Sequence, residues 1–340
     1  MAPNQGWKIV VTDYIEEDLA WEHVLFDTMK NVTFEAHQLK NESKLKVIEA
    51  IKNANILVVN MVKIDTELIE SLLSCKVVIR HGVGYDNIDV DSLTEKGILF
   101  INIPDYCIIE VAEQTIMQIM NCARKFKQQQ RAMVMSMDQG KWCIDMVYPI
   151  YLLRQKTLGI IGCGRIGSAV LQRMRGFEMK FLVCDPYLTE DRKKELGIET
   201  VSLERVLRES DIISIHTPLN DETRHMIRRE QLKMMKQSSF IINSARGGIV
   251  DELALMDAIE NGTIAGAGVD VYEFREPPDR RSKLSSLENL VMTPHLGWYS
   301  VESERNIRER IVAQILKVID GQLPDNIVNA EVLTKIDRFK

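Results

Sequence analysis

A histidine stands between a proline and a glycine-containing turn in the segment "TPHLGWYS", residues 293–300. A restricted backbone of this kind could hold the imidazole of His295 where it donates or accepts a proton near neutral pH. A second candidate, Arg246, lies beside two glycines in "NSARGGIVDE", where its planar guanidinium could bind a carboxylate, a role that lysine fills poorly. Acidic residues follow in "VDVYEFREPP", residues 269–278. Together these groups predict a reaction centre with a cationic residue that binds a carboxylate, a proton donor and an acidic residue beside the donor.

A glycine-rich segment, "LGIIGCGRIGSAV", supplies the most specific motif. An apolar run leads directly into Gly162, Gly164 and Gly167, and helical sequence follows. This spacing favours a tight turn, a close approach of the backbone to a pyrophosphate, and close packing of a helix on a strand. The next apolar run ends at Asp185, whose carboxylate could accept hydrogen bonds from ribose hydroxyls and repel a 2′-phosphate. The motif therefore predicts NAD, in preference to NADP, as cofactor.

A bound hydride source completes the set of chemical groups. Reduction of a 2-keto acid needs a cation for the carboxylate, a proton donor for the carbonyl oxygen, an acid that keeps the donor protonated, and a hydride. Arg246, His295, an acid from the Glu276 segment and NADH would supply these parts. Six cysteines without a CxxC pair indicate neither a disulfide framework nor a metal site.

The elements that must position these residues alternate between strand and helix. Apolar runs rich in valine and isoleucine are separated by segments with apolar residues at helical spacing. This alternation predicts an α/β fold of two doubly wound parallel-sheet domains, a Rossmann domain inserted into a flavodoxin-like one. The expected strands lie at residues 8–11, 55–59, 76–79, 97–101, 158–162, 180–185, 211–216, 240–244, 266–270 and 290–293.

Two long helical patterns indicate where the domains meet. One opens near Glu110 and continues to about residue 135, with its apolar side formed by Val111, Thr115, Met117, Ile119 and Met120. The other follows Glu302 and closes near Gly321, which is suited to end a helix. We therefore expect a substrate-binding domain of residues 1–108 and 302–340, and an NAD-binding domain of residues 109–301.

Composition limits the class of protein. With 45% hydrophobic and 27% charged residues, the chain of 340 residues is typical of a globular protein of two domains. A net charge of -6, with interspersed basic residues, argues against nucleic acid as a partner. No leader or apolar run long enough for a membrane span is evident, so we expect a cytoplasmic protein with no membrane partner.

From residue 76 to about 325 the chain resembles the D-isomer-specific 2-hydroxyacid dehydrogenase family. Matching segments fall in the family's order: "RHGVGYDNIDV", "VAEQT", "LGIIGCGRIG", "CDPY", "HTPLNDETRHMI", "NSARGGIVDE", "GAGVDVYEFREPP" and "TPHLGWYS". The resemblance implies that Arg246 binds the substrate carboxylate and keto oxygen, that His295 is the acid and base, and that Glu276 pairs with His295.

The resemblance also implies the wider site. Substrate-binding residues would be Val83, Gly84, Arg80, Tyr106 and Trp298, with domain closure assembling the two halves. Cofactor-binding residues would be Thr115, Gly162, Gly164, Arg165, Ile166, Gly167, Asp185, Pro186, His216, Thr217, Pro218, Thr223, Ser244, Ala245, Asp270 and Gly297. His216 is expected to line the cofactor rather than to transfer a proton.

One departure from the family pattern leaves open which glutamate pairs with His295. The family usually has four residues between the aspartate of "DV" and the glutamate before proline, whereas five separate Asp270 from Glu276. We interpret this as an insertion and favour Glu276 because it precedes Pro277, while Glu273 remains an alternative.

Within the family, "TPHLGWYS" and the segment after it look most like the C-terminal binding proteins, which are NAD-dependent corepressors. Trp298 stands where relatives more often have glycine, and its apolar ring would suit a bulky or thioether 2-keto acid. Two alternatives remain: a D-3-phosphoglycerate dehydrogenase, with Lys63 and Arg80 near a phosphate, and an NAD(H)-sensing binding protein. The methionine-rich helix after Glu110 and the resemblance both favour a homodimer.

Overall fold

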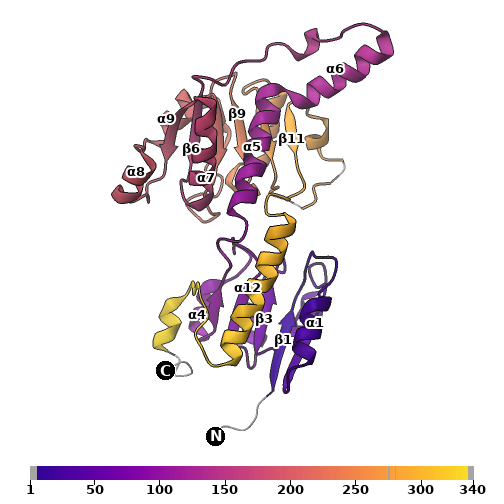
Figure 1. The fold of residues 1–340 in the computed structure, drawn as a ribbon, viewed down its shortest axis with the longest axis vertical. Coiled ribbons are helices and arrows are strands. Elements are labelled where there is room, and N and C mark those ends of the chain that lie inside the picture. The colour runs from indigo at the N-terminus through magenta and orange to yellow at the C-terminus, as the bar shows by residue number, and fades with distance from the viewer. Residues whose placement is uncertain (1–5, 275, 280, 336–340) are drawn as a thin grey trace. The chain divides into compact units, whose positions relative to one another are not determined.

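The computed structural model describes residues 6–274, 276–279 and 281–335. The outermost residues of the expected substrate-binding domain, 1–5 and 336–340, lie outside this part of the chain. The chain divides into two compact units. Unit 1 contains the residues up to Tyr106 together with those from Ser300 onward, and unit 2 contains Cys107–Tyr299. Unit 2 is therefore an insertion in the sequence of unit 1 (Figure 1).

Unit 1 is built on a five-stranded parallel sheet. Its strands are β1 (Trp7–Val11), β2 (Val32–Ala36), β3 (Ile56–Val59), β4 (Val77–Arg80) and β5 (Leu99–Ile101), in the order β2-β1-β3-β4-β5. This is the flavodoxin-like order, which reverses between β1 and β3. The helices are α1 (Ala20–Asp27), α2 (Lys44–Ile51), α3 (Thr66–Ser71), α4 (Val90–Glu95), α12 (Val301–Ile319) and the 3-10 helix η5 (Ala330–Thr334).

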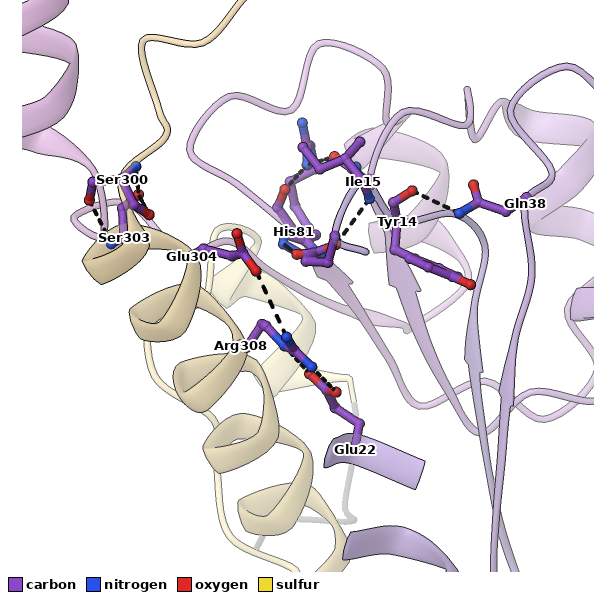
Figure 2. A network of polar contacts seen from close by, with 12 residues as sticks. Tyr14, Ile15, Glu22, Gln38, His81, Ser300, Ser303, Glu304 and Arg308 are labelled. Carbon is purple, nitrogen blue, oxygen red and sulfur yellow. Dashed lines mark hydrogen bonds and ion pairs between the residues drawn. The ribbon is translucent and has the colours of Figure 1, made fainter. Parts of the chain in front are cut away.

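Both faces of this sheet are covered. Val10, Leu57 and Phe100 pack in one buried cluster with residues of α2, α3 and α4. Because side chains alternate along a strand, the equally buried Ile9 and Val58 face the opposite side. There α1 and α12 are joined by an ion pair between Glu22 and Arg308, which Figure 2 shows.

Unit 2 is built on a six-stranded parallel sheet. Its strands are β6 (Thr157–Ile161), β7 (Lys180–Cys184), β8 (Ile212–Ile215), β9 (Phe240–Asn243), β10 (Gly266–Val269) and β11 (Leu290–Met292), in the order β11-β10-β9-β8-β6-β7. The helices are α5 (Ile108–Arg124), α6 (Phe126–Gln139), α7 (Arg165–Met174), α8 (Glu190–Leu196), α9 (Leu203–Glu209), α10 (Arg229–Met234) and α11 (Glu252–Glu260). Short 3-10 helices are η1 (Asp145–Val147), η2 (Arg175–Phe177), η3 (Gly247–Ile249) and η4 (Lys283–Ser286).

Two hydrophobic clusters enclose this sheet. Ile160 and Ile242 belong to a cluster with residues of α5 and α7, whereas their neighbours Ile161 and Ile241 belong to one with residues of α9, α10 and α11. This alternation explains why each strand reads as a continuous apolar run. The predicted α/β fold with two doubly wound parallel sheets is confirmed. No helix in the described ranges is long and apolar enough to cross a membrane.

Two details differ from the predicted elements. The expected strands are present, but β2 was not predicted. The expected single helix from Glu110 to about residue 135 is wrong, because Lys125 takes a left-handed conformation with φ of 51° and separates α5 from α6. The apolar side of α5 is also shifted, since Met117 is 36% exposed and Gln118 is buried in its place.

Candidate active site

The turn that carries His295 is held by a buried aspartate. His295 has a positive φ of 56°, which is uncommon for a residue with a side chain. Asp270, which directly follows β10 and is 1% exposed, accepts hydrogen bonds from the amides of Leu296 at 3.2 Å and Gly297 at 2.7 Å. The hydroxyl of Thr293 also donates to Asp270. These contacts on both sides of His295 fix the turn at the carboxyl end of β11.

His295 forms an ion pair with Glu276. Its Nδ1 lies 2.7 Å from Oε2 of Glu276, and Oε1 of the same carboxylate accepts from the amide of Tyr272 at 3.0 Å. Burial raises the pKa of Glu276, but the hydrogen bond and charge of His295 outweigh burial and hold it below its ordinary value. The carboxylate is thus ionised at neutral pH. Because Nδ1 faces Glu276, Nε2 is the ring nitrogen that can exchange a proton with a ligand.

Glu273, the alternative acid, has different partners. One carboxylate oxygen contacts Nε2 of His225, and the other accepts from the amide of Glu252 at 3.2 Å. The amide of Glu273 in turn donates to the carboxylate of Glu252 at 3.0 Å. Glu276 is therefore the glutamate that contacts His295. Glu273 instead connects the preceding part of the same loop to His225 and Glu252.

Arg246 lies on a loop that packs against this segment. After β9 ends, the side chain of Asn243 accepts from the amide of Ala245 and donates to the carbonyl of Arg246, which folds the loop tightly. A Cβ at Gly247 would overlap the backbone of Tyr272, so only glycine permits this close packing. The charge of Arg246 also lowers the pKa of Glu276. Arg246, Glu276 and His295 are thus brought together at the carboxyl ends of β9, β10 and β11.

The glycine turn between β6 and α7 fits a dinucleotide. Gly162 has a positive φ of 84°, and a Cβ there would lie 2.7 Å from the carbonyl oxygen of His216. A Cβ at Gly167 would overlap the carbonyl oxygen of Gly162. No atom lies within 4 Å of a Cβ built on Gly164. Two glycines are thus required by packing, whereas the third faces open space, where a pyrophosphate could approach the start of α7.

Asp185 lies directly after β7, beside this turn. Its Oδ2 accepts from the amide of Cys163 at 2.8 Å, and its Oδ1 accepts from the amide of Tyr187 at 3.0 Å. The two backbone amides orient the carboxylate at the strand end, as ribose recognition requires. Arg165 and Pro186, the predicted neighbours, are exposed, and Ile166 is partly buried.

The predicted residues after β8 form one loop. The hydroxyl of Thr223 donates to the carbonyl of Pro218 at 2.6 Å, which closes the loop. Nε2 of His216 lies 2.8 Å from the hydroxyl of Ser214. Burial lowers the pKa of His216 to about 4, so its imidazole is neutral at physiological pH and unsuited to donate a proton. Among the described residues, the buried hydroxyl of Thr217 has no hydrogen-bond partner.

Three predicted cofactor residues have a supporting place in this structure. Thr115 is fully buried, and its hydroxyl donates to the carbonyl of Val111 within α5. Asp270 is also buried, and its bond to the amide of Gly297 belongs to the His295 turn. These contacts give all three residues a structural role, and their contact with the cofactor stays a prediction.

Four of the predicted substrate-binding residues belong to unit 1 and one to unit 2. Arg80 is buried, and its guanidinium contacts Asn60 and the carbonyl of His81. The carbonyl of Val83, next to Gly84, accepts from Asn102 at 2.7 Å, and Tyr106 is buried. In unit 2, Trp298 is partly buried and makes an edge contact with Tyr299, with centroids 5.3 Å apart. Their contact with a substrate stays a prediction.

The sequence interpretation missed the polar residues that support the site. Gln114 and Gln118 both lie on the buried side of α5, one helical turn apart. Two glutamines at this spacing in "AEQTIMQ" were the available signal, because a polar residue on an apolar helix face needs a partner inside the protein. Apart from this site, the sequence interpretation also missed an ion pair of 3.0 Å between Glu16 and His81 in unit 1.

This arrangement defines a class, the nicotinamide-dependent oxidoreductases, and comparison with known proteins specifies the family. The chain belongs to the D-isomer specific 2-hydroxyacid dehydrogenase family, whose NAD-binding domain matches residues 116–297. The predicted NAD-dependent oxidoreductase is thereby confirmed.

Individual relatives carry different names. The chain is 39% identical to a glyoxylate reductase of Korarchaeum cryptofilum over 88% of this chain and 91% of that protein. It is 38% identical to a D-3-phosphoglycerate dehydrogenase of Methanocaldococcus jannaschii over 95% of this chain, but spans only 59% of that protein. A D-lactate dehydrogenase structure from Aquifex aeolicus, complexed with NAD and lactic acid, matches with a TM-score of 0.83 and 30% identity, covering 96% of this chain and 98% of that one.

Proposed function

We propose that this protein reduces a 2-keto acid to the D-2-hydroxy acid with NADH, and that His295 donates the proton. The observation that carries this proposal is the 2.7 Å pair between Nδ1 of His295 and Glu276, next to the loop of Arg246. A histidine oriented by a carboxylate through one nitrogen can transfer a proton through the other. The same residues would catalyse the reverse oxidation, with His295 as base.

Each residue has a distinct task in this proposal. The guanidinium of Arg246 binds the planar carboxylate and polarises the keto group. Nε2 of His295 donates a proton to the keto oxygen as negative charge develops there. The ionised Glu276 stabilises the protonated imidazole. NADH supplies the hydride when bound, held by the Gly162–Gly167 turn and Asp185.

We further propose a substrate with a bulky or thioether side chain. Trp298 lies three residues after His295 and presents a partly buried aromatic ring. An indole ring adds apolar contact area, which favours larger side chains over the hydrogen of glyoxylate. The D-3-phosphoglycerate alternative is less favoured, since Arg80 is turned inward to Asn60 and His81.

A panel of keto acids tests the proposal. NADH consumption would be followed with glyoxylate, pyruvate, hydroxypyruvate, 4-methylthio-2-oxobutyrate, 2-ketoisocaproate, phenylpyruvate and 3-phosphohydroxypyruvate. We expect turnover, with the largest kcat/KM for one of the bulky acids. A preference for glyoxylate or pyruvate would refute the bulky-substrate proposal, and a preference for the phosphorylated acid would favour the phosphoglycerate alternative. NADH binding without any turnover would favour an NAD(H)-sensing binding protein.

We also propose that the protein forms a homodimer through α6 and the segment after it, residues 126–152. Figure 1 shows α6 extending beyond α5 and away from the sheet. Large apolar side chains are exposed along this arm: Phe126, Met133, Val134, Met137, Trp142, Ile144, Met146, Tyr148, Tyr151 and Leu152. Large apolar side chains that are exposed in such number along one segment are typical of an interface between proteins.

A further inference from the structure

Gln118 is a buried glutamine on α5 that connects the two loops of the candidate active site. Its side chain is fully buried, so both ends of the amide need partners. Nε2 donates to the hydroxyl of Thr293 at 2.9 Å, and Oε1 accepts from the hydroxyl of Ser244 at 3.1 Å. Ser244 precedes Arg246 by two residues, and Thr293 precedes His295 by two residues.

The sheet is shaped to admit this side chain. β10 lies between β9 and β11, and its residue 268 is glycine. A Cβ on Gly268 would lie 3.1 Å from Cβ of Gln118 and 3.5 Å from its Cδ. The stem of Gln118 therefore crosses β10 at Gly268, and its amide reaches the loops that follow the two flanking strands.

The hydrogen bonds run in one direction through this network. Thr293 uses its single hydroxyl proton to donate to the buried Asp270, so it must accept a proton from Gln118. Asp270 in turn accepts from the amides of Leu296 and Gly297 and from the side chain of Gln114. An amide, which donates at one end and accepts at the other, satisfies this position, whereas a carboxylate does not.

We propose that Gln118 is a positioning residue that sets the spacing between Arg246 and His295. This inference rests on the proposed function, in which one substrate must contact both side chains. A displacement of either loop by about 1 Å can lower the rate of the chemical step by about a hundredfold. Gln118 therefore acts on catalysis through Ser244 and Thr293, without touching the substrate.

Gln118→Glu provides the sharpest test because it changes one amide group to a carboxyl. When ionised, the introduced carboxylate would compete with Asp270 for the hydroxyl proton of Thr293 and repel Asp270. Burial and the charge of Asp270 both raise the pKa of such a carboxyl. When protonated, it can donate to Thr293 and accept from Ser244, as the amide does.

The expected readout is kcat relative to wild type across pH, with the keto acid that wild type turns over fastest. For Gln118→Glu this ratio should fall by about ten- to a hundredfold at neutral pH and recover as the pH decreases. Gln118→Met, which keeps the length but makes neither bond, should give a similar loss that does not depend on pH. Asn121→Asp, three residues further along α5, adds the same charge and should leave the ratio at one. KM for NADH should change little in all three.

Two outcomes would overturn the inference. One is a Gln118→Met variant that folds and keeps the wild-type kcat, which decides the matter even if Gln118→Glu fails to fold. The other is a Gln118→Glu ratio that is reduced but does not change with pH, because general destabilisation of the fold would give that result.

Hydrogen exchange separates this inference from the proposed function. If wild type reduces none of the keto acids, the proposed function fails, and the position of the loops is then judged without turnover. Gln118→Met should exchange faster than wild type in residues 240–250 and 290–299, whereas Asn121→Asp should not. Unchanged exchange in both segments would overturn the role of Gln118.

Discussion

At the scale of single residues, the site depends on buried acceptors that hold a strained turn. His295 adopts a left-handed backbone conformation, which costs on the order of 1 kcal/mol for a residue with a side chain. The hydrogen bonds from Leu296 and Gly297 to Asp270 offset that cost. The turn then presents the imidazole to Glu276, which contacts it from the loop after β10.

Replacement of Glu276 by glutamine should change the pH dependence of the reduction. The pKa of Glu276 is held below its ordinary value, so this carboxylate is fully ionised at every pH above the ordinary pKa of a carboxyl group. Its charge, and with it the pair with His295, is lost only as the pH falls through the depressed pKa. Removing this charge destabilises the protonated imidazole. We therefore expect kcat/KM to fall about tenfold or more at neutral pH, and its alkaline limb to move to lower pH.

Glu273→Gln is the matched control for this experiment. Glu273 contacts His225 and the start of α11, so its replacement should leave the alkaline limb in place. If the alkaline limb of the kcat/KM profile moves equally in both variants, or in neither, Glu276 is not the acid that pairs with His295 during catalysis.

Sequence reasoning at this scale found the residues with reactive side chains but not those that support them. His295, Arg246 and Glu276 stand in segments with distinctive neighbours, and the structure places them together. Sequence reasoning favoured Glu276 from the proline that follows it but kept Glu273 as an alternative, because the direction of each side chain depends on the loop fold. Gln118 was missed because its partners, Ser244 and Thr293, are distant in sequence.

At the scale of elements, continuous apolar runs predicted the central strands, since both faces of these strands are buried. β2 was missed because it is an edge strand whose exposed Thr33 and partly buried Glu35 interrupt the apolar pattern. The break between α5 and α6 was missed because Lys125 carries no signal for a left-handed conformation, which glycine or asparagine would have indicated.

The glycine turn gives a prediction in which two similar substitutions have different effects. Gly164→Ala should leave the stability of the fold nearly unchanged, because a Cβ there meets open space, but should weaken NADH binding. Gly167→Ala should lower the free energy of unfolding by about 1 to 3 kcal/mol, because its Cβ would overlap the carbonyl of Gly162. Thermal unfolding and NADH titration of both variants would measure this. An equal loss of stability in both variants would contradict the account in which Gly167 is required by packing and Gly164 by the approach of the cofactor.

In unit 1, the pair of Glu16 and His81 joins the loop after β1 to the end of β4 and should govern acid stability. Figure 2 shows His81 beside Ile15, whose amide donates to Glu16. Burial raises the pKa of Glu16, but the hydrogen bond and charge of His81 bring it down to about 2 from 4.5. Because the folded value is depressed, this stabilisation is present above about pH 5 and is lost as the pH falls through about 2.

Glu16→Gln should remove this pH dependence. Hydrogen exchange of unit 1 peptides, measured between about pH 5 and pH 3, should vary less in the variant than in wild type. Glu17→Gln, at the exposed neighbouring position, should behave as wild type. Similar pH dependence in Glu16→Gln and wild type would contradict the role of the pair.

At the scale of the whole molecule, the exposed apolar arm of residues 126–152 predicts a homodimer. Aspartate at both Val134 and Met137, which are 53% and 64% exposed, should shift the protein to monomers without unfolding either unit. Light scattering would measure the mass of the variant and of wild type. Leu45→Asp, at a position 79% exposed on α2 of unit 1, is the control and should remain dimeric. A monomeric wild type would refute the proposed dimer.

The most direct test of the central claim compares wild type with His295→Ala during NADH consumption with a keto acid from the panel. Because His295 is proposed to donate the proton, the variant should lose about a hundredfold to ten-thousandfold in kcat. Its affinity for NADH, measured by fluorescence titration, should stay near that of wild type, since His295 is not among the residues proposed to hold the cofactor. Turnover by the variant at the wild-type rate would contradict the account.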